Sequence, residues 1–185
     1  LIEFDYETYV EENIPVEYRE RLKKEIIESD DWLELDRGTL SYNDAAQIFS
    51  SRVPEMKNEI DKMFNEKFSG MLKPIEKNIA LLPELKSKYN LYILSNFHKP
   101  SIEEMKRQHE FFELFDGEVV SCYCHHIKPE PEIYDLIIKK YNLAPEKTLF
   151  IDDREENIEG SEKKGIVGLY LPDHKELQSK LEKYL

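Results

Sequence analysis

Residues 148–153 read Thr-Leu-Phe-Ile-Asp-Asp, an apolar run that ends in two adjacent acids. Short apolar runs of this kind alternate with patterns of helical periodicity through the second half of the chain. This alternation predicts an α/β fold in which a parallel sheet is covered by helices on both faces. The predicted strands are 91–94, 118–121, 148–151 and 167–171, and the predicted helices are 78–89 with a break at Pro83, 101–108, 131–141 and 156–164.

The sequence changes character near Pro74. Over residues 15–71 apolar side chains recur four positions apart, which predicts amphipathic helices. We expect the first of these helices to begin at Pro15. Ser41 followed by Asp44 resembles a capping box, and Pro54 suits the first position of the next helix. The spaced residues are Tyr18, Leu22 and Ile26, then Ala45 and Phe49, then Ile60 and Phe64.

Composition limits the partners and the compartment. The 185 residues suit one domain, or one core with an insertion, and 39 acidic against 26 basic residues give a formal charge of -13. Such a charge disfavours nucleic acid and anionic membrane surfaces. No signal segment or run of roughly 20 apolar residues is present, so we expect a cytoplasmic protein that is monomeric or homodimeric, with Cys122 and Cys124 reduced.

Polar residues follow the predicted strands, and in open parallel sheets such residues gather beyond the carboxyl ends of the strands. Ser95 and Asn96 follow the first strand, where a hydroxyl and backbone N–H groups can hold an anion; ordinary turn chemistry is the alternative. Lys128, stiffened by the proline after it, suits a developing negative charge. Its alternative is a solvated surface lysine.

Asp152 and Asp153 follow the third strand. At about 4 Å and an effective dielectric constant near 20, two carboxylates repel by roughly 4 kcal/mol, so a cation is expected beside them. Hard oxygen ligands at a loop favour Mg²⁺. A helix N-cap is the alternative for Asp153, but it leaves Asp152 unexplained. An anion site, a fixed cation and a Mg²⁺ site together indicate phosphoryl transfer.

The order of these motifs resembles the haloacid dehalogenase superfamily of aspartate-nucleophile hydrolases. The resemblance rests on Leu-Ser-Asn at 94–96, Lys-Pro-Glu-Pro-Glu-Ile-Tyr at 128–134, Phe-Ile-Asp-Asp at 150–153, then Asn157 and Gly165. It is closest to sugar-phosphatase-like members with a helical cap, because Trp-Leu-Glu-Leu-Asp-Arg-Gly at 32–38 is similar to their caps. It implies a Rossmann-like, doubly wound core of residues 1–5 and 75–185 with an inserted cap of residues 6–74.

The resemblance also implies an activity, that of a Mg²⁺-dependent phosphatase acting on small phosphate monoesters, such as sugar or metabolite phosphates, through a phosphoaspartyl intermediate. The implied roles are phosphoryl binding by Ser95 and the Asn96 amide, pairing of Lys128 with nucleophile and phosphate, Mg²⁺ ligation by Asp153 with Asp152 beside it, and support of the acidic loop by Asn157.

The family's nucleophile motif, Asp-x-(Asp or Gly)-Gly-x-Leu, does not occur in the sequence, and the neighbours of Asp5 do not form its glycine turn. We therefore expect roughly a dozen further residues upstream that carry the motif and the central first strand. Three alternatives remain: an inactive phosphate-binding or metal-binding relative, a metal-independent dehalogenase, and a receiver domain. The receiver is disfavoured because its acids precede its lysine along the chain.

Two further features are left open. Cys-Tyr-Cys-His-His at 122–126 contains zinc-ligand residue types, but so short a stretch rarely supplies four ligands, and a loop at the rim of the site is the alternative. Trp32 and Arg37 of the cap are either substrate contacts after closure or a core residue and a solvated or paired arginine.

Overall fold

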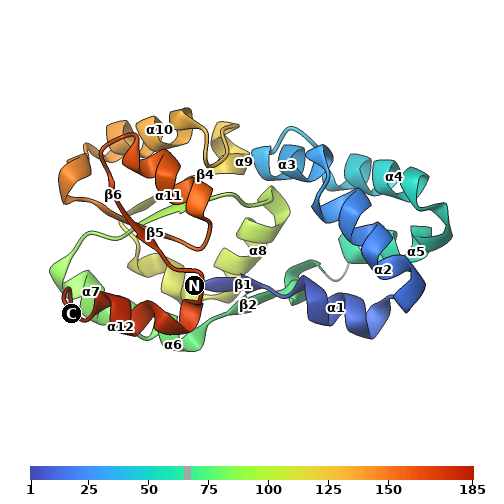
Figure 1. Ribbon diagram of the computed structural model, residues 1–185, viewed down its shortest axis with the longest axis horizontal. Helices are drawn as coiled ribbons and strands as arrows, with labels where there is room; N and C mark the ends of the chain where they lie inside the picture. Colours follow the sequence, from blue (N-terminus) through green and yellow to red (C-terminus); the bar gives the residue numbers. More distant parts are fainter. Residues whose placement is uncertain (65–67) are drawn as a thin grey trace.

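The helices of the first half of the chain pack around one apolar core at one end of the molecule (Figure 1). The computed structural model describes residues 1–64 and 68–185, so residues 65–67 of the predicted helical region lie outside the described residues. The elements of this helical unit are α1 (Tyr6–Asn13), α2 (Val16–Leu22), the π-helix η1 (Lys23–Ile27), α3 (Asp30–Arg37), α4 (Tyr42–Arg52), the 3₁₀-helix η2 (Pro54–Met56), α5 (Lys57–Lys62) and the 3₁₀-helix η4 (Phe68–Met71).

Local signals set the helix boundaries. The Ser41 hydroxyl caps α4 by accepting the Asp44 N–H, and Pro54 begins η2, so both predictions are confirmed. The prediction that the first helix begins at Pro15 is wrong. Asp5 caps an earlier helix, α1, which buries Tyr6, Tyr9 and Val10, and Pro15 is the N-cap of α2.

The second half alternates helices and strands as the sequence predicts. Pro83 lies in the first turn of α7 and separates it from α6, which confirms the predicted break. The elements are β2 (Leu72–Pro74), α6 (Glu76–Ile79), α7 (Leu82–Lys88), β3 (Tyr92–Ser95), α8 (Lys99–Gln108), η5 (Glu110–Leu114), β4 (Gly117–Val120), α9 (Ser121–Cys124), α10 (Pro131–Tyr141), η6 (Pro145–Lys147), β5 (Leu149–Asp152), α11 (Glu155–Glu162), β6 (Val167–Tyr170), η7 (His174–Glu176) and α12 (Leu177–Leu181).

The four core strands form two parallel pairs. β3 pairs with β4 and places Ser95 opposite Val120, whereas β5 pairs with β6 and places Asp152 opposite Tyr170. Within the part of the chain that the structure describes, no ladder joins the two pairs into the single sheet that the sequence predicts. The predicted additional strand stays a prediction.

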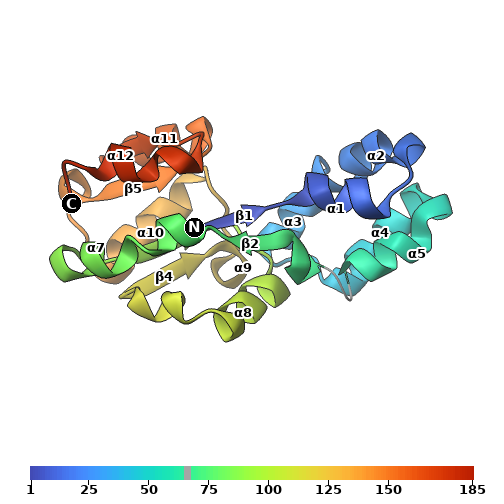
Figure 2. The same cartoon turned by 90° about the horizontal axis from the view of Figure 1, so that it is seen from below.

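An antiparallel ribbon connects the two halves of the molecule (Figure 2). β1 (Ile2–Phe4) pairs with β2, with Glu3 opposite Lys73, so the chain enters and leaves the helical unit at one point. This pairing brings together the two ends of the predicted cap, residues 6–74, and that division stays a prediction. None of the helices formed by residues 1–64 and 68–185 is both long and apolar enough to cross a membrane.

Helices fix the strands that end at the site. Ile133 and Tyr134 of α10 are fully buried, and they pack with Val119 of β4. α11 contacts both β5 and β6. Helix α3 contacts α9, so the helical unit lies beside the segment that follows β4 (Figure 1).

Candidate functional site

A lysine and an aspartate from different loops form the centre of the site. The Lys128 ammonium lies 2.6 Å from Asp152 Oδ2, and their side chains are only 10% and 6% exposed. The same ammonium donates to the Leu94 carbonyl at 3.2 Å, and it lies 5.4 Å from the centre of the Phe150 ring. The three predicted loops therefore converge on one point.

Asn96 holds the backbone of the lysine loop. Its side-chain oxygen accepts the Lys128 N–H at 2.7 Å, and its side-chain amide donates to the Lys128 carbonyl at 3.0 Å. The side chain of Asn96 is therefore occupied in positioning Lys128, and only its backbone amide is available for the predicted phosphoryl contact.

The second oxygen of Asp152 is held by its own loop. Oδ1 accepts the Arg154 backbone N–H at 2.9 Å and the Asn157 side-chain amide at 2.8 Å. Asn157 is 3% exposed, and its predicted support of the acidic loop stays a prediction. Both oxygens of a buried carboxylate are thus satisfied, as burial of a charge requires.

Asp153 differs from its neighbour because it is exposed. Its negative charge lies near the backbone nitrogen of Leu1. The residue that precedes β1 therefore lies near the acidic loop. Ser95 ends β3 half-buried, and its hydroxyl makes a long 3.4 Å contact with the Asn96 carbonyl. This weak contact leaves the hydroxyl available as a donor.

Sequence reasoning missed a buried acid contributed by the helical unit. Asp36, at the end of α3, has a side chain 16% exposed, and its Oδ1 lies 3.4 Å from Nε2 of His98. Burial raises the pKa of Asp36 to about 7, although the charges of Lys128 and Arg154 lower it. Burial also lowers the pKa of His98 to about 3, so both groups favour their neutral forms.

A short polar chain continues from His98. Its Nδ1 lies 3.2 Å from the Tyr42 hydroxyl, which lies 2.5 Å from the Ser101 hydroxyl. Asp36 and Tyr42 belong to the helical unit, whereas His98 and Ser101 lie at the start of α8. The position of Asp36 directly after the apolar Leu35 was only a weak sign that its side chain is buried. Its partner His98 lies 62 residues later in the sequence, so no local pattern could identify the pair.

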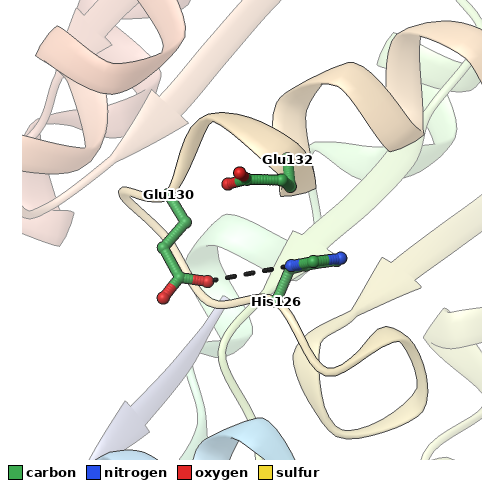
Figure 3. A group of neighbouring side chains, drawn as sticks. All are labelled: His126, Glu130 and Glu132. Carbon is green, nitrogen blue, oxygen red and sulfur yellow. Dashed lines mark ion pairs between the residues drawn. The ribbon is translucent and has the colours of Figure 1, made fainter.

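The cysteine and histidine segment after β4 forms part of the contact with the helical unit. Cys122 and Cys124 are free, as predicted. His126, Glu130 and Glu132 lie together (Figure 3), with possible ligand atoms within 4.8 Å of one another. Glu130 is already engaged by Arg37 in a bidentate ion pair, so the group is explained as part of the contact with α3.

The acidic loop has a donor set that suits Mg²⁺. Two adjacent carboxylates at the end of a strand, one exposed, match an ion that takes one or two carboxylates and keeps waters and phosphate oxygens. Asn157 Oδ1 next to this loop is buried without a hydrogen-bond partner among the described residues. The residues present therefore fit the ion.

Comparisons with known proteins identify the family of the chain. Residues 17–169 match the family described as haloacid dehalogenase-like hydrolase. A sesquiterpene phosphatase of Aspergillus oryzae is 30% identical over 149 residues, which cover 80% of this chain and 76% of that protein. A phosphorylated carbohydrates phosphatase of Thermotoga maritima is 28% identical over 132 residues, covering 71% of this chain and 58% of its own.

A solved structure shows the same fold. It is a haloacid dehalogenase family enzyme of Bacteroides thetaiotaomicron in complex with magnesium and inorganic phosphate, with a TM-score of 0.74 and 22% identity. The match covers 92% of this chain and 88% of that one. The family match spans most of the chain, and the described site has the lysine and acids in the expected order. The chain belongs to the haloacid dehalogenase-like hydrolase family.

Proposed function

We propose that the full-length protein is a Mg²⁺-dependent phosphatase of small phosphate monoesters, working through a phosphoaspartyl intermediate. Family membership and phosphatase relatives support this proposal. Those relatives are named for a sesquiterpene substrate and for phosphorylated carbohydrates, which share the phosphate ester rather than the carbon skeleton. The proposal therefore covers the monoester class, with sugar or metabolite phosphates as the first candidates, in a cytoplasmic monomer or homodimer.

One observation carries the proposal. The buried ion pair between Lys128 and Asp152 lies where the loops after β3, β4 and β5 meet, and Asn96 fixes the lysine backbone there. A fixed ammonium, a weakly bonded hydroxyl at Ser95 and an exposed acid at Asp153 are the groups that a phosphoryl oxyanion and its counter-ion require.

The proposed roles follow from these positions. The Ser95 hydroxyl and the Asn96 backbone N–H would donate to phosphoryl oxygens, and the Lys128 ammonium would neutralise charge on the phosphoryl group. Asp153 and Asp152 would hold Mg²⁺, with Asn157 keeping the Asp152 carboxylate oriented. The bound ion would supply positive charge that lowers the cost of bringing a carboxylate nucleophile to a phosphate.

The expected reaction has two balanced steps. An aspartate carboxylate attacks phosphorus while the ester oxygen leaves with its electron pair and takes up a proton from solvent to become an alcohol. Water then attacks the phosphoaspartyl group, which regenerates the carboxylate, releases inorganic phosphate and returns one proton to solvent. No described residue of this chain is assigned the role of nucleophile.

Asp153→Ala in the full-length protein tests the metal role. We expect Mg²⁺-dependent hydrolysis of an aryl phosphate to be abolished, because the exposed ligand is removed. Glu146→Ala is the matched control, since Glu146 is an exposed acid just before the other end of β5. Unchanged turnover by the Asp153 variant, with Mg²⁺ required as before, would refute the metal role.

A further inference from the structure

Lys128 lies within a tight turn whose two ends bond to each other. The Glu130 backbone N–H donates to the Ile127 carbonyl at 2.8 Å. In return, the Ile127 N–H donates to Glu130 Oε2 at 3.0 Å. The Glu130 side chain therefore closes the turn that presents Lys128, and any movement of this carboxylate changes the backbone on both sides of the lysine.

The carboxylate that closes this turn is held by the helical unit. Arg37 of α3 donates to Glu130 through both terminal nitrogens, from Nη1 to Oε2 at 2.9 Å and from Nη2 to Oε1 at 2.7 Å. The side chains are 23% and 32% exposed, so the pair is partly shielded from water. A bidentate arginine–carboxylate pair fixes direction as well as distance.

Two further hydrogen bonds from Arg37 go to neighbouring segments. Nε donates to Glu34 at 3.3 Å, and Nη1 donates to the His125 carbonyl at 3.2 Å. The His125 ring nitrogen Nδ1 lies 2.9 Å from the Arg37 carbonyl, which adds a second link between the same two segments. All three guanidinium nitrogens thus have protein partners, and four of the five N–H groups of Arg37 donate to them.

The lysine turn consequently has one anchor from each half of the molecule. Asn96 holds the Lys128 backbone from the core, and Arg37 holds Glu130, two residues later, from the helical unit. Between these anchors the Lys128 side chain reaches the Leu94 carbonyl and Asp152. The ammonium is a point charge on a flexible stem, so its position depends on how firmly its backbone is held.

We infer that Arg37 is a positioning residue of the site, which acts through Glu130 on the turn at 127–130 and so sets the place of the Lys128 ammonium. This inference rests on the proposed function for its kinetic consequence, but its structural content concerns Lys128 alone. The contact of the helical unit with the core thereby becomes part of the assembled site.

The kinetic test uses the full-length protein with an aryl phosphate and Mg²⁺. We expect Arg37→Gln to lower kcat by 10- to 100-fold, because the lysine turn loosens, while KM changes by less than threefold. Arg37→Lys should recover only part of the loss, because it keeps the charge but not the bidentate geometry. In the double variant Arg37→Gln/Glu130→Gln, a loss of kcat no larger than that of either single change would show that the pair itself matters.

Arg21→Gln is the matched control, since Arg21 forms an exposed ion pair with Glu55 inside the helical unit. It should leave kcat within twofold of the wild type. A raised KM with unchanged kcat in Arg37→Gln would instead make Arg37 a substrate contact, and unchanged kcat and KM would make the ion pair merely structural. Either result would overturn the inference.

A second measurement does not depend on activity. Limited acetylation of lysines, quantified by mass spectrometry on protein shown to be folded, reports the accessibility of each ammonium. We expect Arg37→Gln to increase labelling of Lys128 at least fivefold relative to the exposed Lys99, with Arg37→Lys intermediate. Unchanged labelling of Lys128 would refute the inference. Increased labelling in a protein whose wild type shows no hydrolysis would refute only the proposed function.

Discussion

The Lys128 ammonium and the Asp152 carboxylate form a 2.6 Å ion pair between two side chains that are almost fully buried. Each comes from a different strand–helix connection, so the pair joins the loop after β4 to the end of β5. Taking both charges out of water is costly, and Leu94, Arg154 and Asn157 supply the hydrogen bonds that offset this cost. A buried pair of this kind is weak evidence for a stabilising role, which is consistent with the proposed role at the site.

Lys128→Ala should therefore damage both stability and activity. It leaves Asp152 buried with its two N–H donors but without a cation, and we expect a loss of about 3 kcal/mol in the free energy of unfolding. Turnover should fall by orders of magnitude, because no fixed positive charge remains beside the phosphoryl group. Urea denaturation and steady-state kinetics measure the two effects. Lys147→Ala changes an exposed lysine and serves as control. A loss of turnover of only twofold in Lys128→Ala would mean that Lys128 has a structural role alone.

Asn157→Ala should weaken metal binding while leaving the two acids in place. The side-chain amide of Asn157 orients Asp152 through Oδ1, and loss of such a supporting contact typically costs about 10- to 100-fold in metal affinity or activity. The Mg²⁺ concentration for half-maximal activity should rise accordingly. Asn90→Ala changes an exposed asparagine and serves as control. The same Mg²⁺ dependence in both variants would contradict the supporting role.

Local signals explain why much of the fold was predictable. The helix predicted at 131–141 forms over these residues, because Pro131 suits a first turn and Asn142 adopts the left-handed conformation that ends the helix. The residues at the strand ends were also identifiable, because a parallel sheet brings its carboxyl ends together. Helix α1 was not predicted, although Asp5 is a common N-cap residue type, because the clearer apolar periodicity begins only after Pro15.

The contacts between the halves were not predictable. Arg37 and Glu130 are 93 residues apart, and their pairing depends on how α3 packs against α9 rather than on any periodicity. The same is true of Asp36 and His98. Asn96 was predicted at the site, but its side chain holds the lysine backbone, a role that only the geometry reveals.

Asp36→Asn should change how stability depends on pH. Burial raises the pKa of Asp36 from 3.8 to about 7, so the folded state keeps a proton that the unfolded state loses. Stability contributed by this proton is present below about pH 4 and is lost as the pH rises toward 7. The wild type should therefore lose about 2 kcal/mol relative to the variant between about pH 5.5 and about pH 8.

Urea denaturation of the metal-free proteins at the two pH values measures this difference. His98 is present in both proteins, so its own low pKa affects both alike. Asp135→Asn is the control, because Asp135 is an exposed acid paired with Lys164 on the surface of α10. A constant difference in the free energy of unfolding between wild type and Asp36→Asn across this range would show that Asp36 titrates normally.

Gly38→Ala should separate the helical unit from the core. Gly38 ends α3 with φ +76°, and a Cβ there would lie 2.5 Å from the Cys122 carbonyl oxygen and 2.8 Å from Cys122 Cα. Both neighbours are backbone atoms of α9, so neither can move as a flexible side chain would. The left-handed conformation and the overlap together should cost about 3 kcal/mol.

For a chain of this length that cost corresponds to a Tm lower by about 6–12 °C. Gly70→Ala is the matched control, because nothing lies within 4 Å of a Cβ at that position. Since Arg37 directly precedes Gly38, the variant should also loosen Glu130 and increase acetylation of Lys128. A Tm equal to that of the Gly70 variant would mean that α3 and α9 separate without cost, which would be incompatible with a lysine turn held from the helical unit.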